Sequence, residues 1–366
     1  MKPPVQAALT DARRRGQKGA TIPTGMPLFR EDFMSVRFAI LGAGRIGQVH
    51  ARAISETPGA ELVAIYDPVK KAAKSVRDTY GCEIRSVEDC VQAKDIDAVA
   101  ICTPTDLHAD QIEMFARAGK AVFCEKPIDL SVERVRSCLK VVEETGATLM
   151  IGFNRRFDPD FRALHDTIEA GEIGKVEMVT VVSRDPGAPP IDYIKRSGGI
   201  FRDMTIHDFD IARWMLGDEV ESVIAQASVL VDKEIGKAGD YDSVNVVLKT
   251  KKGRQCVITN SRRATYGYDQ RIEVLGSKGM ASAENIHENR VQVANGKGFA
   301  RRPLVNFFLE RYMPAYKAEI AAFVTAVNDK TTPPTTGHDG LMALVLAEAA
   351  NISVAEGRAV KVSEIA

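Results

Sequence analysis

The sequence has no excess of charge of either sign. Lys and Arg together number 49 among the 366 residues, as do Asp and Glu, so the formal net charge is zero. This balance argues against a nucleic-acid-binding protein or a polybasic membrane-surface protein, because both need a cationic surface. No window approaches ~18 uninterrupted apolar residues, so no transmembrane helix is expected. The N-terminus also lacks the apolar core of a secretory signal.

Paired cysteine motifs are missing as well. The six cysteines are scattered, none forms a Cys-x-x-Cys pair, and several lie in apolar runs such as VAICTP. Buried, reduced thiols in a cytoplasmic protein explain this distribution. No cluster of His and Cys has the spacing of a metal shell, so we expect no bound metal.

The first half of the chain alternates between strand-like and helix-like segments. Residues 1–33 show little periodicity and are expected to form a flexible extension. Apolar runs at residues 36–41, 62–66 and 98–102 predict strands, and helical stretches follow each of them. Such alternation favours parallel strands joined by right-handed crossovers. We therefore predict a doubly wound α/β domain over residues 34–155.

The pattern changes after about residue 156. Segments rich in Val, Thr and Ile, such as DSVNVVLKT and RQCVITNSR, predict successive strands with short turns. Helical stretches near residues 312–328 and 338–355 close the chain. Residues 156–366 are predicted to form a second α/β domain with a large, open, mostly antiparallel sheet. Its closing helices either stay with that sheet or pack back on the first domain. An open sheet often packs against a copy of itself.

The strongest local signal is the segment FAILGAGRIGQVH. Gly42, Gly44 and Gly47 form a G-x-G-x-x-G motif between an expected strand and an expected helix. Glycines there allow a tight turn and let a pyrophosphate approach the helix N-terminus. Asp67 follows Gly47 by 20 residues, the spacing of a carboxylate that binds the adenosine ribose hydroxyls. This favours NAD over NADP, but lysines at residues 70–71 leave the preference open. The alternative is a structural turn with a helix-capping Asp.

Further candidates follow the later strands at the carboxyl edge of the sheet, where ligands bind in this architecture. His108 is either a site residue or a partly buried histidine at a helix start. Lys126 can polarise a hydroxyl or carbonyl oxygen, or it is a surface lysine before a proline turn. The predicted cofactor contacts are Gly42, Gly44, Arg45, Ile46, Gly47, Asp67, Thr103, Pro104, His108, Glu125 and Lys126.

A second constellation lies in the segment GGIFRDMTIHDFDIARWML. Apolar spacing from Ile206 to Leu216 predicts a helix, and Asp203 and His207 are then i and i+4 on one face. A histidine can take a proton near neutral pH, and a carboxylate can orient it, balance its charge or contact a substrate. An ordinary polar pair on a helix surface is the alternative. A metal set that includes Asp210 lacks a further ligand.

In order along the chain, GAGRIG, CTPTDLH, EKP, GFNRRFDP and GGIFRDMTIHD resemble the glucose–fructose oxidoreductase / inositol dehydrogenase / MocA family. The resemblance runs from about Val36 to the C-terminus. The segments NSRRATYGYDQRIEVLGSKG, FFLERYMPAYKAEIAAF and GHDGLMALVLAEAA are similar to the inositol 2-dehydrogenases of that family. The resemblance implies an N-terminal Rossmann domain, a C-terminal α/β domain with an open sheet, and a homotetramer formed by packing of those sheets.

The resemblance also implies an activity and the residues that carry it. It implies NAD-dependent oxidation of a cyclic polyol, with myo-inositol giving 2-keto-myo-inositol (scyllo-inosose). His207 is then the base, Asp203 steadies the imidazolium and Lys126 stabilises the developing oxyanion. The stereoisomer stays open, because some relatives carry Met at the position of Asn154. Alternatives are a dehydrogenase of another inositol isomer or sugar, an NAD-dependent glycoside hydrolase and a non-catalytic NAD-binding protein. The implied substrate contacts are Lys126, Asn154, Arg155, Asp203, His207 and Tyr268.

Overall fold

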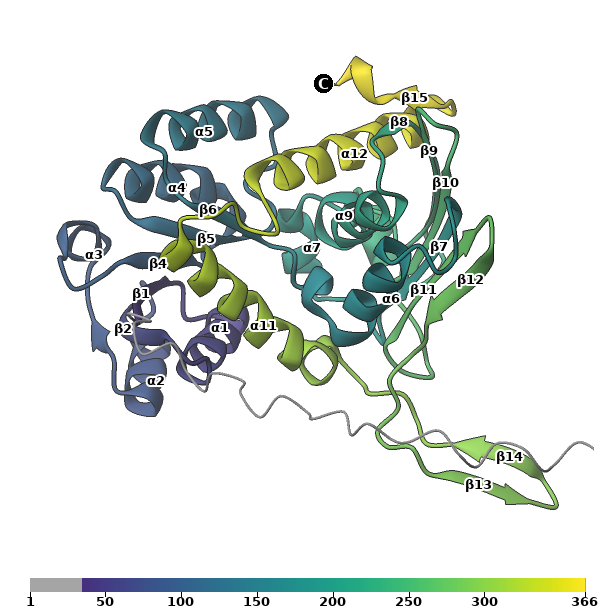
Figure 1. The fold of residues 1–366 in the computed structure, drawn as a ribbon, viewed down its shortest axis with the longest axis horizontal. Helices are drawn as coiled ribbons and strands as arrows, with labels where there is room; N and C mark the ends of the chain where they lie inside the picture. Colours follow the sequence, from purple (N-terminus) through teal and green to yellow (C-terminus); the bar gives the residue numbers. More distant parts are fainter. Residues whose placement is uncertain (1–34, 366) are drawn as a thin grey trace, which may run out of the picture. The chain divides into compact units, whose positions relative to one another are not determined.

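Six parallel strands form the first sheet of the computed structural model, which describes residues 35–365 (Figure 1). The extension predicted at residues 1–33 lies outside the described residues. The strand order β3-β2-β1-β4-β5-β6 reverses between β1 and β4. This is the doubly wound order, in which ligands bind at the carboxyl ends of the strands beside the reversal. The elements are β1 (Val36–Leu41), α1 (Arg45–Ser55), β2 (Ala60–Tyr66), α2 (Lys70–Tyr80), β3 (Glu83–Ile84), α3 (Val87–Gln92), β4 (Ala98–Ile101), α4 (His108–Arg117), β5 (Ala121–Glu125), α5 (Val132–Thr145) and β6 (Leu149–Gly152).

Local sequence explains these elements. Phe38, Ile40 and Leu41 of β1 are fully buried, as expected for a parallel strand that helices cover on both faces. Helix α5 begins after Ser131, whose hydroxyl accepts a hydrogen bond from the backbone N of Arg134 at 3.2 Å. Such a cap satisfies one of the free N–H groups at a helix start. The strands and helices predicted for the first half of the chain are therefore confirmed.

The second sheet has seven strands in the order β12-β11-β7-β10-β9-β8-β15. Strands β7 and β10 pair in parallel, and the other neighbours are antiparallel, so the predicted mostly antiparallel sheet is confirmed. In β9, buried and exposed residues alternate, because one face meets the core and the other does not. The strands are β7 (Val176–Arg184), β8 (Val220–Ser228), β9 (Ser243–Thr250), β10 (Gln255–Ser261), β11 (Asp269–Gly276), β12 (Gly279–Ala283) and β15 (Val360–Lys361). A separate hairpin joins β13 (Gln292–Asn295) to β14 (Gly298–Arg301).

Some helices of the second half pack on one face of this sheet, and the last two helices of the chain contact the first sheet. Helices α9 and α12 lie on the same face of the seven strands (Figure 1). Helix α11 packs back on the first sheet, where the Phe323 ring lies 5.7 Å from that of Phe38 and 5.9 Å from that of Phe123, centroid to centroid. Within residues 35–365, no helix is both long and apolar enough to cross a bilayer. The helices are α6 (Pro159–Glu169), α7 (Ile191–Ser197), α8 (Ile200–Asp203), α9 (Thr205–Leu216), α10 (Lys233–Lys237), α11 (Phe308–Asp329) and α12 (Gly337–Glu356).

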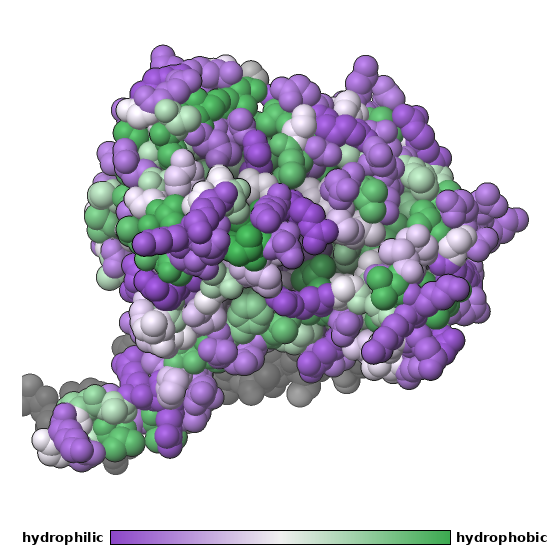
Figure 2. All heavy atoms as spheres, turned by 180° about the vertical axis from the view of Figure 1, so that it is seen from behind, coloured by the Kyte–Doolittle hydropathy of each residue, from purple (hydrophilic) through white to green (hydrophobic). Residues whose placement is uncertain are grey.

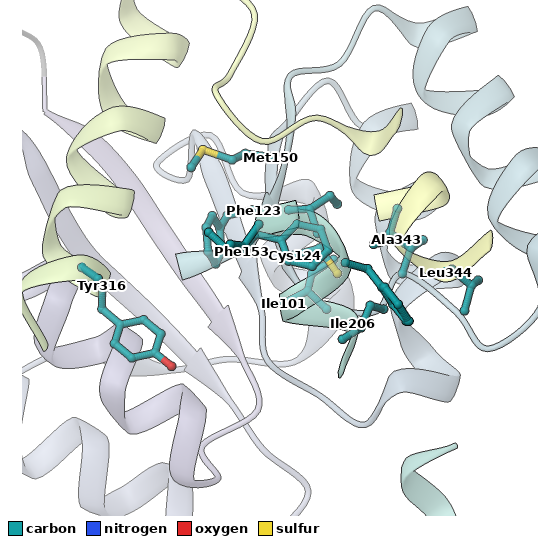
Figure 3. Packing of buried hydrophobic residues seen from close by; sticks show 14 of the residues in the cluster. Ile101, Phe123, Cys124, Met150, Phe153, Ile206, Tyr316, Ala343 and Leu344 are labelled. Carbon is teal, nitrogen blue, oxygen red and sulfur yellow. The ribbon is translucent and has the colours of Figure 1, made fainter. Parts of the chain in front are cut away.

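One apolar cluster extends from the first sheet into the second half of the chain. Figure 3 shows members of this cluster from β5 (Phe123, Cys124), from α9 (Ile206) and from α12 (Ala343, Leu344). Protein interiors of this kind are close-packed and transmit small displacements. The loops that follow β5 and the segment that precedes α9 are therefore held by one continuous core.

Candidate active site

The glycine turn after β1 has the shape that a pyrophosphate needs. Gly42 has a φ of +96°, and a Cβ there would lie 2.5 Å from the carbonyl oxygen of Cys102. A Cβ on Gly47 would lie 1.9 Å from the carbonyl oxygen of Gly42. A Cβ on Gly44, by contrast, would meet nothing within 4 Å. Packing thus requires two of the glycines, and the third leaves open space in front of α1, whose N-terminus has no side-chain cap. Phosphate oxygens can accept hydrogen bonds from those free N–H groups.

Asp67 lies beside this turn, as its spacing predicts. Its Oδ2 accepts a hydrogen bond from the backbone N of Ala43 at 2.6 Å, and its Oδ1 accepts one from Val69 at 2.7 Å. Each carboxylate oxygen retains a lone pair that can accept a ribose hydroxyl. In the same turn, Arg45 is exposed, with its guanidinium carbon 5.8 Å from the centroid of the Phe307 ring, and Ile46 is half-buried. The donors and acceptors therefore fit a dinucleotide with free ribose hydroxyls.

His108 ties together two loops of the predicted cofactor site. It is the first residue of α4 and is buried. Its Nδ1 lies 2.8 Å from the carbonyl oxygen of Pro127, and its Nε2 lies 2.8 Å from that of Thr103. Burial lowers the pKa of His108, and a neutral ring donates only one of these two hydrogen bonds at a time. Both ring nitrogens thus face main-chain carbonyls, while the exposed Pro104 borders the same loop.

Glu125 and Lys126 are neighbours in sequence, but their side chains contact different parts of the protein. The Glu125 carboxylate is buried, with its Oε1 2.6 Å from Nε2 of His50 on α1. The Lys126 ammonium donates to the backbone carbonyl of Asp203 at 2.8 Å, and it lies 3.8 Å from the Asp203 carboxylate. The Lys126 ammonium therefore links two motifs that are separate in the sequence, one after β5 and one before α9.

The predicted pairing of Asp203 with His207 on one helix face is not observed. Helix α8 ends at Asp203 and α9 begins at Thr205, because the backbone at Met204 (φ −96°, ψ −59°) interrupts the helix. The Asp203 carboxylate instead accepts a hydrogen bond from the hydroxyl of Tyr193 at 2.7 Å and lies 3.4 Å from the Arg262 guanidinium. Among the described residues, no hydrogen bond joins Asp203 to His207.

His207 is an unprotonated base in this environment. Its Nδ1 is buried and has no hydrogen-bond partner in the described part of the chain. Its ring packs edge-on against Phe153, with the centroids 6.3 Å apart. Burial, and then the positive charges of Lys126 and Arg155, hold the pKa of His207 well below its ordinary value. A neutral imidazole beside an ammonium can accept a proton while the ammonium stabilises an oxyanion.

The predicted substrate residues Arg155, Asn154 and Tyr268 are all buried, but they have different partners in the protein. Arg155 forms a buried ion pair with Asp208 of α9, and it also donates to the Ser183 hydroxyl at 3.2 Å. Asn154 is buried. Tyr268 is buried against Tyr312, with the ring centroids 6.0 Å apart. The charge of Arg155 is therefore balanced by the protein.

Three residues of the site were missed by the sequence predictions: Asp185, Tyr193 and Arg262. Burial raises the pKa of Asp185 to about 6, although Arg262 and Arg155 oppose this shift. Asp185 follows the last residue of β7 and precedes a proline, which is the strand-end signal that singled out Thr103. Arg262 comes directly after β10 in the segment NSRR, but nothing in the sequence distinguishes it from its neighbours. Tyr193 has no sequence signal.

Comparison with known families agrees with this geometry. Residues 36–153 match an oxidoreductase family with an NAD-binding Rossmann fold, and residues 161–282 match the GFO/IDH/MocA C-terminal domain. The chain belongs to the GFO/IDH/MocA oxidoreductase family. The resemblance found in the motifs, the predicted α/β fold and the expected NAD cofactor are thereby confirmed.

Three relatives illustrate the similarity. An inositol 2-dehydrogenase from Rhizobium meliloti (strain 1021) is 60% identical over 330 residues, which cover 90% of this chain and all of that protein. The crystal structure of a myo-inositol dehydrogenase from Corynebacterium glutamicum has a TM-score of 0.86 at 43% identity and covers 90% of this chain and 99% of its own. The scyllo-inositol dehydrogenase from Lactobacillus casei, solved with NAD(H) and scyllo-inositol, has a TM-score of 0.84 at 31% identity, with 90% and 99% covered.

Proposed function

We propose that this chain is an NAD-dependent dehydrogenase of a cyclic polyol, which oxidises myo-inositol to 2-keto-myo-inositol. The observation that carries the proposal is the meeting of the Lys126 ammonium with the Asp203–His207 segment, in a chain 60% identical to an inositol 2-dehydrogenase. In this proposal, residues 34–155 bind NAD, and residues 156–366 bind the substrate and form the contacts between subunits.

The residues of the site suit the removal of a hydroxyl proton coupled to loss of a hydride. NAD, when bound, supplies the hydride acceptor at its nicotinamide ring. His207 takes the hydroxyl proton, because burial and nearby cations keep its imidazole neutral. Lys126 stabilises the negative charge that develops on the substrate oxygen. The carbonyl of Asp203 holds that ammonium in place, and in this proposal the Asn154 amide contacts a substrate hydroxyl.

The dinucleotide would be held by the glycine turn and Asp67. The N–H groups at the start of α1 face the open space at Gly44 and bind pyrophosphate. The Asp67 carboxylate accepts the ribose hydroxyls and repels a 2′-phosphate, which favours NAD over NADP. Thr103 and Pro104 line the same edge of the first sheet, with His108 behind them.

We also propose that four copies assemble through the open face of the second sheet in the cytoplasm. Ile224 and Val247 are cross-strand neighbours on that face and are both exposed. The β13–β14 hairpin adds exposed apolar residues, with Phe299 80% exposed, and green residues mark this hairpin at the lower left of Figure 2. All six cysteines, which lie within residues 35–365, are buried free thiols, which is typical of a reducing compartment.

A second candidate is a dehydrogenase of another inositol isomer. The observation in its favour is Asn154, a buried amide next to Arg155 in the chain, which can select among hydroxyl orientations. The Lactobacillus casei relative, moreover, is named for scyllo-inositol rather than myo-inositol. The preference for one inositol isomer over another depends on single contacts in the substrate pocket, each worth about 1–3 kcal/mol.

The test is a panel of polyols with the purified protein. NADH or NADPH formation is followed by absorbance with myo-, scyllo- and chiro-inositol and with glucose, each with NAD and with NADP. We expect the largest kcat/KM with myo-inositol and NAD. A larger value with scyllo-inositol supports the second candidate. Failure to reduce either dinucleotide with every cyclic alcohol contradicts the proposal, and release of sugar from a glycoside without net NADH indicates a hydrolase.

A further inference from the structure

Helix α8 carries Asp203 and is only four residues long, Ile200–Asp203. Its first backbone N–H, at Ile200, donates to Oδ1 of Asp240 at 2.8 Å. Its last residue is Asp203, after which the helix is interrupted at Met204. A helix of one turn has almost no stability of its own. The position of Asp203 therefore depends on contacts made from outside the helix.

Arg262 connects the two ends of α8. Its guanidinium lies 3.5 Å from Oδ2 of Asp240, at the start of the helix, and 3.4 Å from Oδ2 of Asp203, at its end. The side chain is 1% exposed, so little water screens these attractions. Guanidinium keeps its charge at every accessible pH. The backbone N–H of Arg262 also donates to Asp242 at 2.9 Å, which anchors the residue to the second sheet.

Tyr193 holds the same carboxylate through its other oxygen. Its hydroxyl donates to Oδ1 of Asp203 at 2.7 Å, while Arg262 engages Oδ2. Tyr193 lies in α7 and is 48% exposed as a whole. The two carboxylate oxygens thus have different partners, Tyr193 on Oδ1 and the buried Arg262 on Oδ2.

This arrangement matters because of how Lys126 is held. The ammonium donates to the backbone carbonyl of Asp203, not to its carboxylate, which is 3.8 Å away. A change in the backbone at the end of α8 therefore moves the acceptor that places the ammonium. We propose that Arg262 and Tyr193 are positioning residues, which clamp Asp203 so that its carbonyl holds Lys126 toward the reacting oxygen. The consequence for catalysis rests on the proposed function; the clamp itself does not.

The clamp can be tested without catalysis, through the reactivity of Lys126 in the cofactor-free full-length protein. Lysines are acetylated with limiting acetic anhydride, and Lys126 is quantified by mass spectrometry relative to Lys120. Lys120 is a suitable internal reference, because its ammonium also donates to a backbone carbonyl, that of Ile96 at 2.8 Å, away from α8. Three variants are compared with the natural protein: Arg262→Lys, Tyr193→Phe, and the control Tyr266→Phe. Arg262→Lys keeps the positive charge but loses the planar set of N–H donors of the guanidinium group. The control removes a hydroxyl that donates to a different carboxylate, Asp269, at 2.6 Å.

We expect Arg262→Lys and Tyr193→Phe to raise Lys126 acetylation about three- to tenfold. In each variant the Asp203 carboxylate loses a hydrogen bond, and hydrogen bonds to charged groups are among the stronger ones. The control should leave it unchanged. With myo-inositol, kcat should fall about tenfold in both clamp variants, while the KM for NAD stays within about twofold. Unchanged acetylation in Tyr193→Phe overturns the proposal even if kcat falls. Should Arg262→Lys fail to fold, Tyr193→Phe carries the test alone, because it removes one hydroxyl from a half-exposed ring. Raised acetylation in a protein that oxidises no polyol leaves the clamp supported and the proposed function contradicted.

Discussion

His207 is the residue on which the proposed proton transfer depends. Burial and two neighbouring cations hold its pKa well below the ordinary value, which is about 6.5. Lowering the pH through that ordinary value therefore leaves the folded imidazole neutral. Protonation, and with it the loss of the base, comes only at a lower pH. The unfolded chain binds this proton first, so His207 also makes the protein less stable as the pH falls below about 6.5.

We predict that the imidazole of His207 stays neutral at a pH where an ordinary histidine is half protonated. The measurement is an NMR titration of the histidine rings in the cofactor-free protein, with the His207 signal assigned by its absence in His207→Ala. The same variant should lose about 10²–10⁴-fold in kcat, the range of general base catalysis. A ring that titrates at or above about pH 6.5, or a variant with near-native kcat, contradicts the role assigned to His207.

Asp185 affects the pH dependence of protein stability in the opposite direction to His207. Burial raises its pKa to about 6 in the folded protein, compared with about 3.9 in an unfolded chain. The folded state therefore binds more protons between these values, so stability falls as the pH rises through them. A shift of roughly two pKa units corresponds to up to about 3 kcal/mol.

For Asp185→Asn we therefore predict a stability gain that depends on pH. Relative to the natural protein, the variant should be more stable by up to about 3 kcal/mol at pH 8, with a difference that shrinks toward pH 4. Urea unfolding at several pH values measures this directly. A difference that is constant over the whole pH range would mean that the titration of Asp185 has no effect on stability.

Charge partners that are distant in sequence explain why parts of the site could not be predicted. Arg155 forms an ion pair with Asp208, which lies 53 residues away in the sequence. Arg262 and Asp203 are 59 residues apart. Nothing local in one sequence connects such residues. Lys126, in contrast, follows a strand that ends at the ligand edge, so its place was predictable.

At the scale of elements, the turn between β1 and α1 shows that the three glycines have different tasks. Gly47 is required by packing, since an added Cβ would lie 1.9 Å from the carbonyl oxygen of Gly42. Gly44 has a φ of −66°, which any residue can adopt, and open space in front of it. One glycine therefore serves the fold, and the other serves the approach of the ligand.

This difference predicts distinct outcomes for two alanine substitutions. Gly44→Ala should keep the Tm of the cofactor-free protein within a few degrees and weaken NAD binding about tenfold or more, because the methyl group occupies the pyrophosphate space. Gly47→Ala should lower the Tm as well, because helix α1 must move. Calorimetric titration with NAD and thermal unfolding measure the two effects. Equal loss of Tm in both variants would contradict this division of roles.

The elements themselves were predictable to different degrees. Strict apolar runs predicted β1 and β4 almost to the residue, because parallel strands buried on both faces leave a plain signal. The helix before Leu216 was predicted, but its interruption at Met204 was not, since Met is an ordinary helix former. The β13–β14 hairpin was not predicted at all. Its short, exposed strands pack against no apolar core within the described residues, so they carry no clear alternation.

At the scale of the whole molecule, the second sheet has a face that no described helix covers. Exposed apolar residues on that face include Ile224, Val247 and Leu275. Exposed apolar residues gathered on one face of a soluble protein are a feature of association sites. A sheet that meets its own copy about a twofold axis buries the same residues from both subunits, so one substitution acts twice at each contact.

We therefore predict that Ile224→Asp disrupts the assembly. Light scattering should give the natural protein a mass about four times 39.9 kDa and the variant a smaller mass, because each contact would bury two carboxylates without partners. Met114→Asp is the matched control, since Met114 of α4 and Ile224 of β8 are both 41% exposed, but Met114 lies on the outer layer of the first sheet. Loss of mass in both variants would indicate general destabilisation, and an unchanged mass in Ile224→Asp would show that the subunits meet elsewhere. The sequence alone could indicate that such an open sheet exists. It could not show which residues lie on the uncovered face, because that depends on where α9 and α12 pack.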